Sequence, residues 1–246
     1  MTKKYPSHFY HPHSPEEIKS RLSKKRARSY LRDVVYGAID GTVTTFAVVA
    51  GVVGSGLPNK VILILGAANL LADGFSMAAS NYLGTKTESE ERELARKFEK
   101  SQIEENPEGE KEEVRQILSS KGFQGELLGQ ATEVFTQDKK KCVEFMLLEE
   151  YDLSSPGRHP LHAATFTFMA FILFGLIPLL PTLFHLKEAF FWACLMTSTA
   201  FFIVGSLKSY WTTEMFLKAG FKTFLIGNGA ASLAYAVGVL LKEWVK

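Results

Sequence analysis

Apolar and charged residues are segregated along this chain into long blocks. Residues 34–84 and 161–242 are nearly free of charge, whereas residues 1–33 and 86–158 are highly charged. The near-zero mean hydropathy of +0.03 therefore averages two different environments. A helix needs about 20 apolar residues to cross the hydrocarbon core of a bilayer. Five segments reach that length and are predicted to span a membrane: 34–54, 61–84, 162–184, 188–208 and 221–242.

The same pattern predicts how the chain is organised. Its four parts are a basic N-terminal segment (1–33), two spans (34–85), a Glu-rich insert (86–158) and three further spans (159–246). The insert reads as helices broken at Asn106-Pro107 and at Gly122, because proline disfavours helix at the preceding residue and glycine suits a C-terminal cap. The predicted fold is all-α, a polytopic membrane protein with five transmembrane helices and a helical cytoplasmic domain inserted between spans two and three.

Lys and Arg set the predicted orientation. Nine of them lie among residues 1–33, and the connection after the fourth span adds Lys208, Lys218 and Lys222. The predicted outer connections, 55–60 and 185–187, hold one lysine each. Since basic residues are retained on the cytoplasmic side, the N-terminus and the insert are predicted to be cytoplasmic and the C-terminus to lie outside.

Several local features complete this picture. Pro178 and Pro181 are tolerable in the third span where neighbouring helices cover the freed carbonyls. Trp211 and Trp244 fall at predicted helix ends, where indole rings favour the membrane interface. The cysteines, Cys142 and Cys194, fall in different parts of the layout, so no disulfide between them is expected.

The basic run KSRLSKKRARSYLRD, residues 19–33, has three possible roles: contact with nucleic acid, contact with anionic lipid, or a topology signal. Beside a membrane span, lipid is favoured over nucleic acid, because each basic residue near an anionic surface contributes roughly 1 kcal/mol. The many charges in the first thirty residues argue against a secretory signal.

The first span carries an unusual polar face. Gly37, Asp40, Gly41 and Thr44 share one side of the helix, where small residues let another helix approach closely. Asp33 lies at the mouth of the same span. A carboxylate inside the membrane costs at least about 2.5–3.5 kcal/mol on insertion, so it is rare without a function.

The second span carries a matching stripe. Asn69, Asp73 and Met77 recur every fourth residue, followed by Asn81. Singly, Met77 is readily explained as core filling and Asp73 as a structural hydrogen-bonding residue. Together with Asp40 they indicate an ion pathway, in which these residues form one wall and Asp40 faces them from the other helix.

The residue types indicate the ion. Carboxylates alone suit Mg²⁺ and Ca²⁺, whereas a methionine thioether favours softer divalent transition metals such as Fe²⁺, Mn²⁺, Co²⁺ and Zn²⁺. Carboxylates in a low dielectric also take up protons, which offers a way to couple metal movement to protons. The sequence contains no phosphate-binding glycine loop, which argues against ATP-driven pumping.

Four stretches together resemble the vacuolar iron transporter family: RDVVYGAIDGTVTTFAVVAGVVG, ANLLADGFSMAASNYLGTKTE, FILFGLIPLLP and LIGNGAASLAYAVGVLL. The resemblance runs from about residue 31 to the end. It implies a homodimer of five-helix protomers with a pathway at the dimer interface, and a second span that continues into a metal-binding cytoplasmic domain. It also implies export of Fe²⁺, often with Mn²⁺, from the cytosol against protons, without any cofactor.

The resemblance also assigns residues. On the pathway it places Asp33, Asp40, Asn69 and Met77, with Asp73 compensating for an amide at a position where many relatives carry glutamate. In the insert it places the metal ligands Glu99, Gln102, Glu110, Glu113, Met146 and Glu150. Gln102 replaces a glutamate, so weaker binding is expected. Independently, Glu110 with Glu113 and Met146 with Glu150 are spaced so that each pair can face one metal.

Two other functions are less consistent with the sequence. A membrane-bound ferroxidase would need Glu-x-x-His pairs in the insert, which lacks them. A metal sensor without transport needs no carboxylates in the bilayer. The expectation is therefore a transporter and not an enzyme, with metal ions, protons, lipid and a second copy of the chain as partners and no nucleic acid. A prokaryotic plasma membrane is the expected location.

Overall fold

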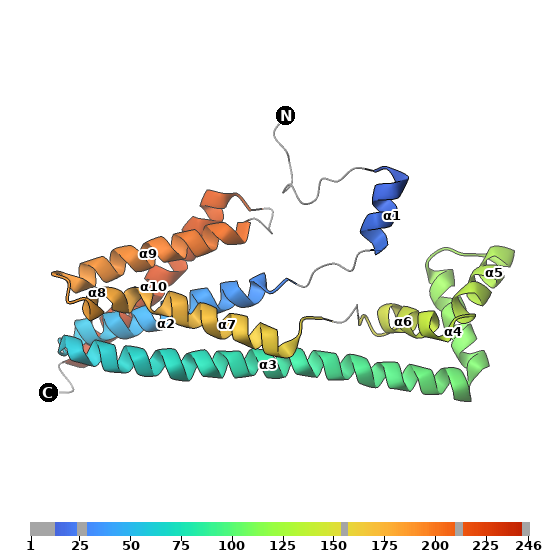
Figure 1. Cartoon of the computed structure of the whole chain (residues 1–246), viewed down its shortest axis with the longest axis horizontal. Coiled ribbons are helices and arrows are strands. Elements are labelled where there is room, and N and C mark those ends of the chain that lie inside the picture. Colours follow the sequence, from blue (N-terminus) through green and yellow to red (C-terminus); the bar gives the residue numbers. More distant parts are fainter. Residues whose placement is uncertain (1–12, 24–28, 154–156, 210–213, 243–246) are drawn as a thin grey trace. The chain divides into compact units, whose positions relative to one another are not determined.

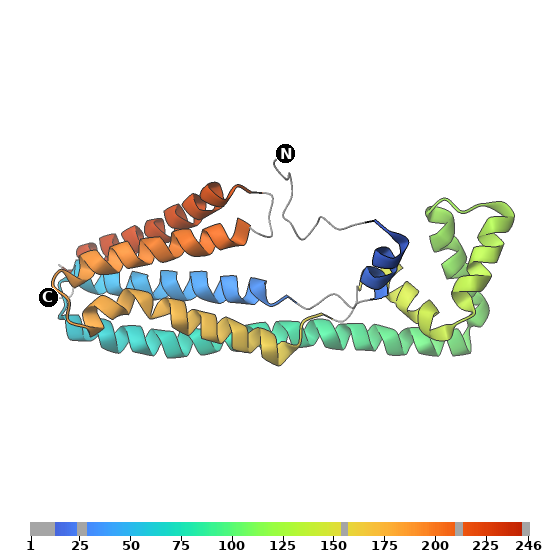
Figure 2. The same ribbon diagram turned by 45° about the horizontal axis from the view of Figure 1, so that its top comes forward.

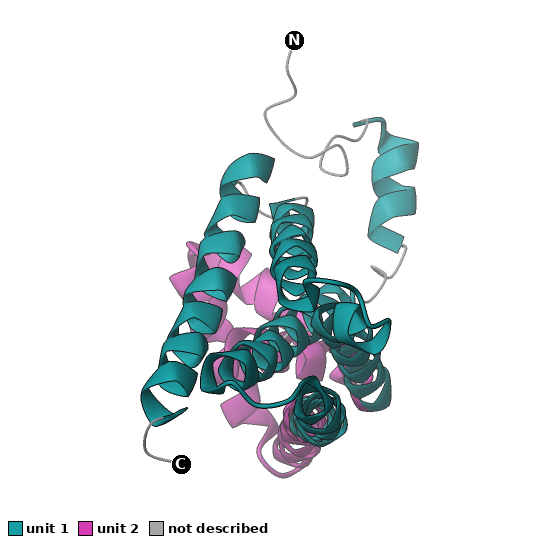
Figure 3. Cartoon of the chain, turned by 90° about the vertical axis from the view of Figure 1, so that its left-hand side faces the viewer, with its two compact units in different colours: residues 1–82, 161–246 teal, residues 83–160 magenta. Residues whose placement is uncertain are grey.

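The computed structural model of the chain describes residues 13–23, 29–153, 157–209 and 214–242. All secondary structure in these ranges is helical, and five helices there are long and apolar enough to cross a membrane. The expected all-α fold with five candidate spans is thus confirmed. The chain forms two compact units, distinguished by colour in Figure 3: residues 1–82 with 161–246 (unit 1), and residues 83–160 (unit 2). Trp211, Trp244 and residues 24–28 of the basic run lie outside the described residues.

Unit 1 contains the candidate spans. Its elements are α1 (Pro15–Ser23), α2 (Leu31–Ser55), the first part of α3 (Asn59–Glu105), α7 (Pro160–Gly175), η2 (Ile177–Leu179), α8 (Leu180–Leu183), α9 (Ala189–Lys208) and α10 (Phe216–Lys242). The first span begins three residues earlier than predicted, so Asp33 lies in the first turn of α2. The last begins five residues earlier, so Lys218 and Lys222 belong to α10 and not to the connection before it. Both helices begin within polar sequence, so the length of the apolar stretch alone does not show where each helix starts.

The third span is interrupted near its prolines. Helix α7 ends at Gly175, and a 3₁₀ turn follows, in which the Leu179 N–H donates to the Leu176 carbonyl over 3.0 Å. Pro178 has no N–H, and its ring would clash with the carbonyl one turn back in a continuous helix. The span therefore tolerates its prolines by changing helix type.

The core of unit 1 lies where α2 meets its neighbours. Helix α10 packs along both α2 and α9, as Figures 1 and 2 show. Figure 2 also shows α2 and α7 beside the N-terminal half of α3. Phe46, Val49, Phe171 and Phe201 are almost completely buried in this core. Thus α2 is the central helix of unit 1, and its polar residues Asp33, Thr42 and Thr45 are buried.

Helix α3 is continuous over 47 residues, about 70 Å at 1.5 Å per residue. It passes from unit 1 into unit 2 between Tyr82 and Leu83 without a break. No proline occurs between Asn59 and Glu105 to stop it. The predicted change from apolar to charged sequence therefore happens along one helix.

Unit 2 adds three short helices: α4 (Pro107–Ser120), α5 (Gly125–Thr136) and α6 (Lys139–Glu149). The two predicted breaks are confirmed. The Asn106 side chain caps α4 by accepting from the Gly109 N–H, and Gly122 has a φ of 96°, which favours glycine. The helices enclose an apolar core of Val114, Leu118, Leu128, Cys142 and Met146.

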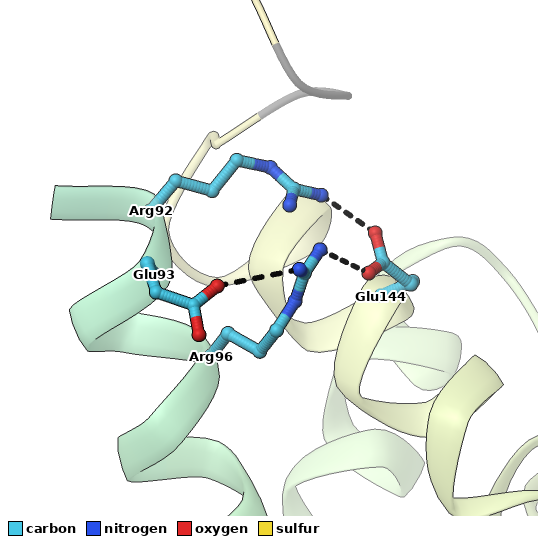
Figure 4. A network of polar contacts seen from close by, with 4 residues as sticks. All are labelled: Arg92, Glu93, Arg96 and Glu144. Atoms are coloured by element: carbon cyan, nitrogen blue, oxygen red, sulfur yellow. Dashed lines mark hydrogen bonds and ion pairs between the residues drawn. The ribbon is translucent and has the colours of Figure 1, made fainter. Parts of the chain in front are cut away.

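An ion-pair network fixes α6 to the second half of α3. Arg92 and Arg96 each donate to a different oxygen of Glu144 over 2.6 Å, and Arg96 also contacts Glu93 (Figure 4). The Arg92 side chain is only 9% exposed, whereas that of Glu144 is 49% exposed, so only the arginine side of this pair is shielded from water. This clamp holds α6 in register with α3, which also positions the acidic residues described below.

Candidate metal-binding sites

Three helices of unit 1 meet at Asn81. Its amide donates to Asp33 Oδ1 on α2 over 2.9 Å and to Thr167 Oγ1 on α7 over 2.7 Å. The Thr167 hydroxyl donates its own proton to the Ala163 carbonyl, so its oxygen is left to accept from the amide. Asp33 is 1% exposed. The carboxylate predicted at the mouth of the span is therefore held inside a polar junction.

Further along the same helix pair, the two polar stripes meet again. The Asn69 amide donates to Thr44 Oγ1 over 3.3 Å, and that hydroxyl donates to the Asp40 carbonyl over 2.9 Å. The carboxylates of Asp40 and Asp73 are close enough for their charges to interact. The residues of α3 therefore meet those of α2 in antiparallel order.

Not every member of the predicted stripe faces the polar contacts. Met77 is partly buried and packs against the apolar core of unit 1. Asp73 is exposed on the unit 1 surface, although it interacts with Asp40. The predicted small-residue face of α2 contacts two different helices. Gly37 and Gly41 pack against the backbone of Thr167 and Phe171 on α7, whereas Thr44 contacts Asn69 on α3.

Unit 2 holds a second cluster of acidic residues. Glu99 on α3 is 1% exposed and Glu110 on α4 is 6% exposed. The Oε2 atoms of both receive no hydrogen bond from an N–H or hydroxyl donor among the described residues, and the two carboxyls can share a proton when Glu110 is protonated. Buried carboxylate oxygens without a donor are costly, so these two atoms are candidates to bind a cation.

The charges in this cluster act on one another. Burial, followed by the negative charges of Glu99 and Glu113, a hydrogen bond with Glu99 and the charge of Glu150, raises the pKa of Glu110 to about 7. Burial and the charges of Glu99 and Glu113 also raise the pKa of Glu150. A divalent cation would relieve this repulsion, so metal binding should displace protons from the cluster.

The remaining predicted ligands lie in different environments. Glu113 and Glu150 are exposed, Gln102 is half-buried, and Met146 is completely buried in the apolar core of unit 2. Within the described ranges, no three His, Cys, Asp or Glu side chains have the arrangement of a metal site. Binding at this cluster therefore requires the side chains to close on the ion.

Two contacts were not predicted from the sequence. The Tyr151 hydroxyl donates to Glu99 Oε1 over 2.9 Å, and Asn81 joins Asp33 to Thr167. Asn81 continues the stripe of Asn69 and Asp73, which was a signal for its role. Tyr151 had no comparable signal, because it belongs to no repeating pattern of polar residues in the sequence.

Comparison with known proteins shows the family of this chain. A model of the VIT family matches residues 31–239. The chain belongs to the VIT family. Two of its relatives are a vacuolar iron transporter of Toxoplasma gondii, 33% identical, and vacuolar iron transporter 1 of Arabidopsis thaliana, 29% identical. The alignments cover 87% of this chain and 74% of the first relative, and 88% of this chain and of the second.

A third VIT relative, vacuolar iron transporter 2 of Oryza sativa subsp. japonica, is 31% identical over 86% of this chain and 87% of its own length. These names agree with the expectation of a transporter and not of an enzyme. They do not support the expected prokaryotic plasma membrane, because all three relatives are eukaryotic proteins named for a vacuole. What the comparisons and the helices support is a multi-pass membrane protein of the VIT family.

Proposed function

We propose that this VIT-family chain is a proton-coupled transporter that moves Fe²⁺, and also Mn²⁺, out of the cytosol. One observation carries the proposal: the polar residues of α2 and α3 meet in antiparallel order, with Asn81 at Asp33, Asp73 near Asp40 and Asn69 at Thr44. The relatives named vacuolar iron transporter support iron as the substrate. Co²⁺ and Zn²⁺ fit the same ligands.

Carboxylates within the membrane suggest how metal and protons are coupled. Leaving Asp40 or Asp73 charged in a low dielectric is unfavourable, so each is stabilised by either a metal ion or a proton. A carrier that releases metal on the far side would then return with protons bound to the same groups. Asp33 would receive the metal at the cytoplasmic mouth, and Met77 would supply the softer ligand.

The pathway is proposed to lie between two copies of the chain. Only 22% of the most apolar window of α3 is buried, against 56% for α2. Helix α3 is exposed on two sides, with Asp73 on one and Leu71 and Phe75 on nearly the opposite one, because residues two positions apart in a helix differ by about 200°. A carboxylate facing lipid is costly, whereas a second copy could cover it and complete an ion path. Helix α10 is even more exposed, with 17% of the corresponding window buried, but it has no carboxylate among its residues.

Unit 2 is proposed to be the cytoplasmic domain that collects metal for the pathway. Glu99 and Glu110 supply buried oxygens, and Glu113 and Glu150 add negative charge within interaction distance of Glu110. Gln102 would contribute an amide oxygen. For Met146 to bind metal, its side chain would have to leave the apolar core that now holds it.

Flux measurements test the transport proposal directly. Purified chain is reconstituted into proteoliposomes that are acidic inside, and lumenal metal and pH are followed together after Fe²⁺ or Mn²⁺ is added. We expect metal uptake with matching proton loss, abolished in Asp40→Ala and strongly reduced in Met77→Ala. Met169→Ala is the matched control, because Met169 is half exposed on α7 and lies outside the proposed pathway.

Each outcome has a definite meaning. Metal uptake without proton movement would reject the coupling but keep the transporter. Intact protein that binds Mn²⁺ without any flux would reject the transporter and favour a membrane-bound metal sensor. Chemical cross-linking of Ser76→Cys between two copies tests the interface, because Ser76 is exposed on the side of α3 that carries Asp73, and a monomer that transports at the full rate would reject it.

A further inference from the structure

Tyr151 is held in place at the end of α6 by several independent contacts. Asp152 has a φ of 55°, and the Leu153 N–H donates to the Leu147 carbonyl over 2.7 Å, which turns the chain sharply after the helix. Tyr151 and Leu153 then pack against the buried cluster of Ala95, Val143 and Leu147. The ring is thus fixed by the backbone turn and by packing before its hydroxyl makes any polar contact.

The hydroxyl of this fixed ring points to the most buried acid of unit 2. It donates to Glu99 Oε1 over 2.9 Å, and Oε2 of the same carboxylate accepts from no N–H or hydroxyl donor among the described residues. Glu110 Oε2 is likewise buried without such a donor, and the two carboxyls can share a proton that a bound metal would displace. A phenol has an ordinary pKa of about 10, so the Tyr151 hydroxyl is a proton donor at neutral pH.

We propose that Tyr151 is a positioning residue that restricts Glu99 to one metal-binding oxygen and thereby selects small divalent transition metals over Ca²⁺. The inference rests on the proposed metal binding of unit 2. With one oxygen held by the phenol, the carboxylate cannot rotate freely to chelate an ion through both atoms. Ca²⁺ takes about six to eight oxygen ligands and readily accepts two from one carboxylate, so it loses more from this restriction than Mn²⁺ does.

The test compares two ions in the full-length protein. Mn²⁺ and Ca²⁺ affinities are measured by titration calorimetry on wild type, on Tyr151→Phe, which keeps the ring but removes the hydroxyl, and on Tyr235→Phe. Tyr235 packs on Phe190 in unit 1 and serves as the control for the same atomic change. We expect Tyr151→Phe to weaken Mn²⁺ binding by about 10-fold, as is usual for loss of a group that orients a ligand, and Ca²⁺ binding by clearly less.

A merely structural role for Tyr151 predicts a different result, because equal weakening of both ions would leave their affinity ratio unchanged and would overturn the inference. Unchanged affinities would overturn it as well. The metal-binding proposal itself fails if wild type binds no Mn²⁺, or if Glu110→Ala binds Mn²⁺ as tightly as wild type. If wild type binds Mn²⁺ and Glu110→Ala weakens it, only the role of Tyr151 is in question.

Terbium luminescence tests whether the bound ion lies close to Tyr151. Tyr151 is the only tyrosine between residues 83 and 160, and that stretch has no tryptophan. Tb³⁺ bound beside Glu99 should therefore emit when tyrosine is excited. At saturating Tb³⁺, Tyr151→Phe should lose most of the emission that Glu110→Ala also removes. Emission unchanged in Tyr151→Phe would place the bound ion away from this tyrosine and overturn the inference.

Discussion

Asn81 donates a hydrogen bond to Asp33 across 48 residues of sequence, and the two side chains join α3 to α2 where the Asp33 carboxylate is almost completely buried. Thr167 receives the second proton of the same amide and adds α7 to the junction. The amide cannot be reversed without facing its carbonyl oxygen toward the carboxylate. This single side chain therefore sets both the register of three helices and the orientation of an acid in the proposed pathway.

Replacing Asn81 by Ala should destabilise unit 1 and slow transport. A hydrogen bond to a charged group contributes about 1.5–3 kcal/mol, and Asn81→Ala removes one such donor from the buried Asp33 carboxylate. The control is Asn228→Ala, which removes a neutral bond to Ser198 between α9 and α10 and should cost about 0.5–1.5 kcal/mol. Thermal unfolding in detergent and metal flux are the measurements. Equal flux in the two variants would contradict a role for Asn81 in the pathway.

Close packing of α2 on α7 depends on Gly41. A Cβ atom there would lie 2.4 Å from the Phe171 carbonyl oxygen and 2.9 Å from its Cα, and neither backbone atom can move independently of the helix. Gly41→Ala should therefore separate the two helices and lower the melting temperature markedly. At Gly229 in α10 an added Cβ meets nothing within 4 Å, so Gly229→Ala should be neutral or stabilising by up to about 1 kcal/mol. Similar melting temperatures for the two variants would refute this account of the packing.

The sequence predicted the helices of this protein well because their signals are local. Apolar length identified the five spans, and Asn106-Pro107 and Gly122 marked the breaks in the insert. The ends of α2 and α10 were less well predicted, since a helix can continue through polar residues such as Asp33 or Lys218 once its apolar part is anchored. Helix ends depend on surroundings that apolar length does not report.

The candidate sites were only partly predictable for a related reason. The four-residue spacing identified Asn69 and Asp73, but whether a side chain meets a partner depends on the rotation and register of two helices. Asn69 reaches Thr44, whereas Met77 packs into the core. In unit 2 the contact of Tyr151 with Glu99 depends on a turn after α6 that no pattern in the sequence announces.

The clamp on Glu144 should contribute more to stability than an ordinary surface ion pair. The Glu144 carboxylate accepts hydrogen bonds from both Arg92 and Arg96, and the Arg92 side chain is largely buried (Figure 4). Glu144→Ala would leave a buried guanidinium without this partner and should destabilise unit 2 by about 1–3 kcal/mol. Glu112→Ala removes a pair with Arg115 that is exposed on both sides and should cost no more than about 1 kcal/mol. Thermal unfolding of the two variants checks the difference, and equal costs would show that the clamp has no special role.

Glu110 should make the metal-free protein less stable as the pH rises. Its pKa is about 7 in the folded chain and near 4.5 when unfolded, so between these values the folded state binds more protons. Stability must then fall with increasing pH across that window, because folding is favoured where protons are bound. Bound metal replaces the protons, so stabilisation by Mn²⁺ should be small at pH 5 and large above pH 7. Melting temperatures measured with and without Mn²⁺ across this range check both trends.

Glu110→Gln separates these two effects in one variant. The amide has nearly the same shape without the charge, so the metal-free variant should melt at a higher temperature than wild type above pH 7 and at a similar temperature near pH 5. Mn²⁺ should stabilise it less than wild type, because the site has lost a carboxylate. Glu126→Gln is the control, since Glu126 is exposed in the first turn of α5, outside the acidic cluster. A Glu110→Gln variant that is less stable than wild type at high pH would show that the carboxylate is needed for folding and not for binding a cation.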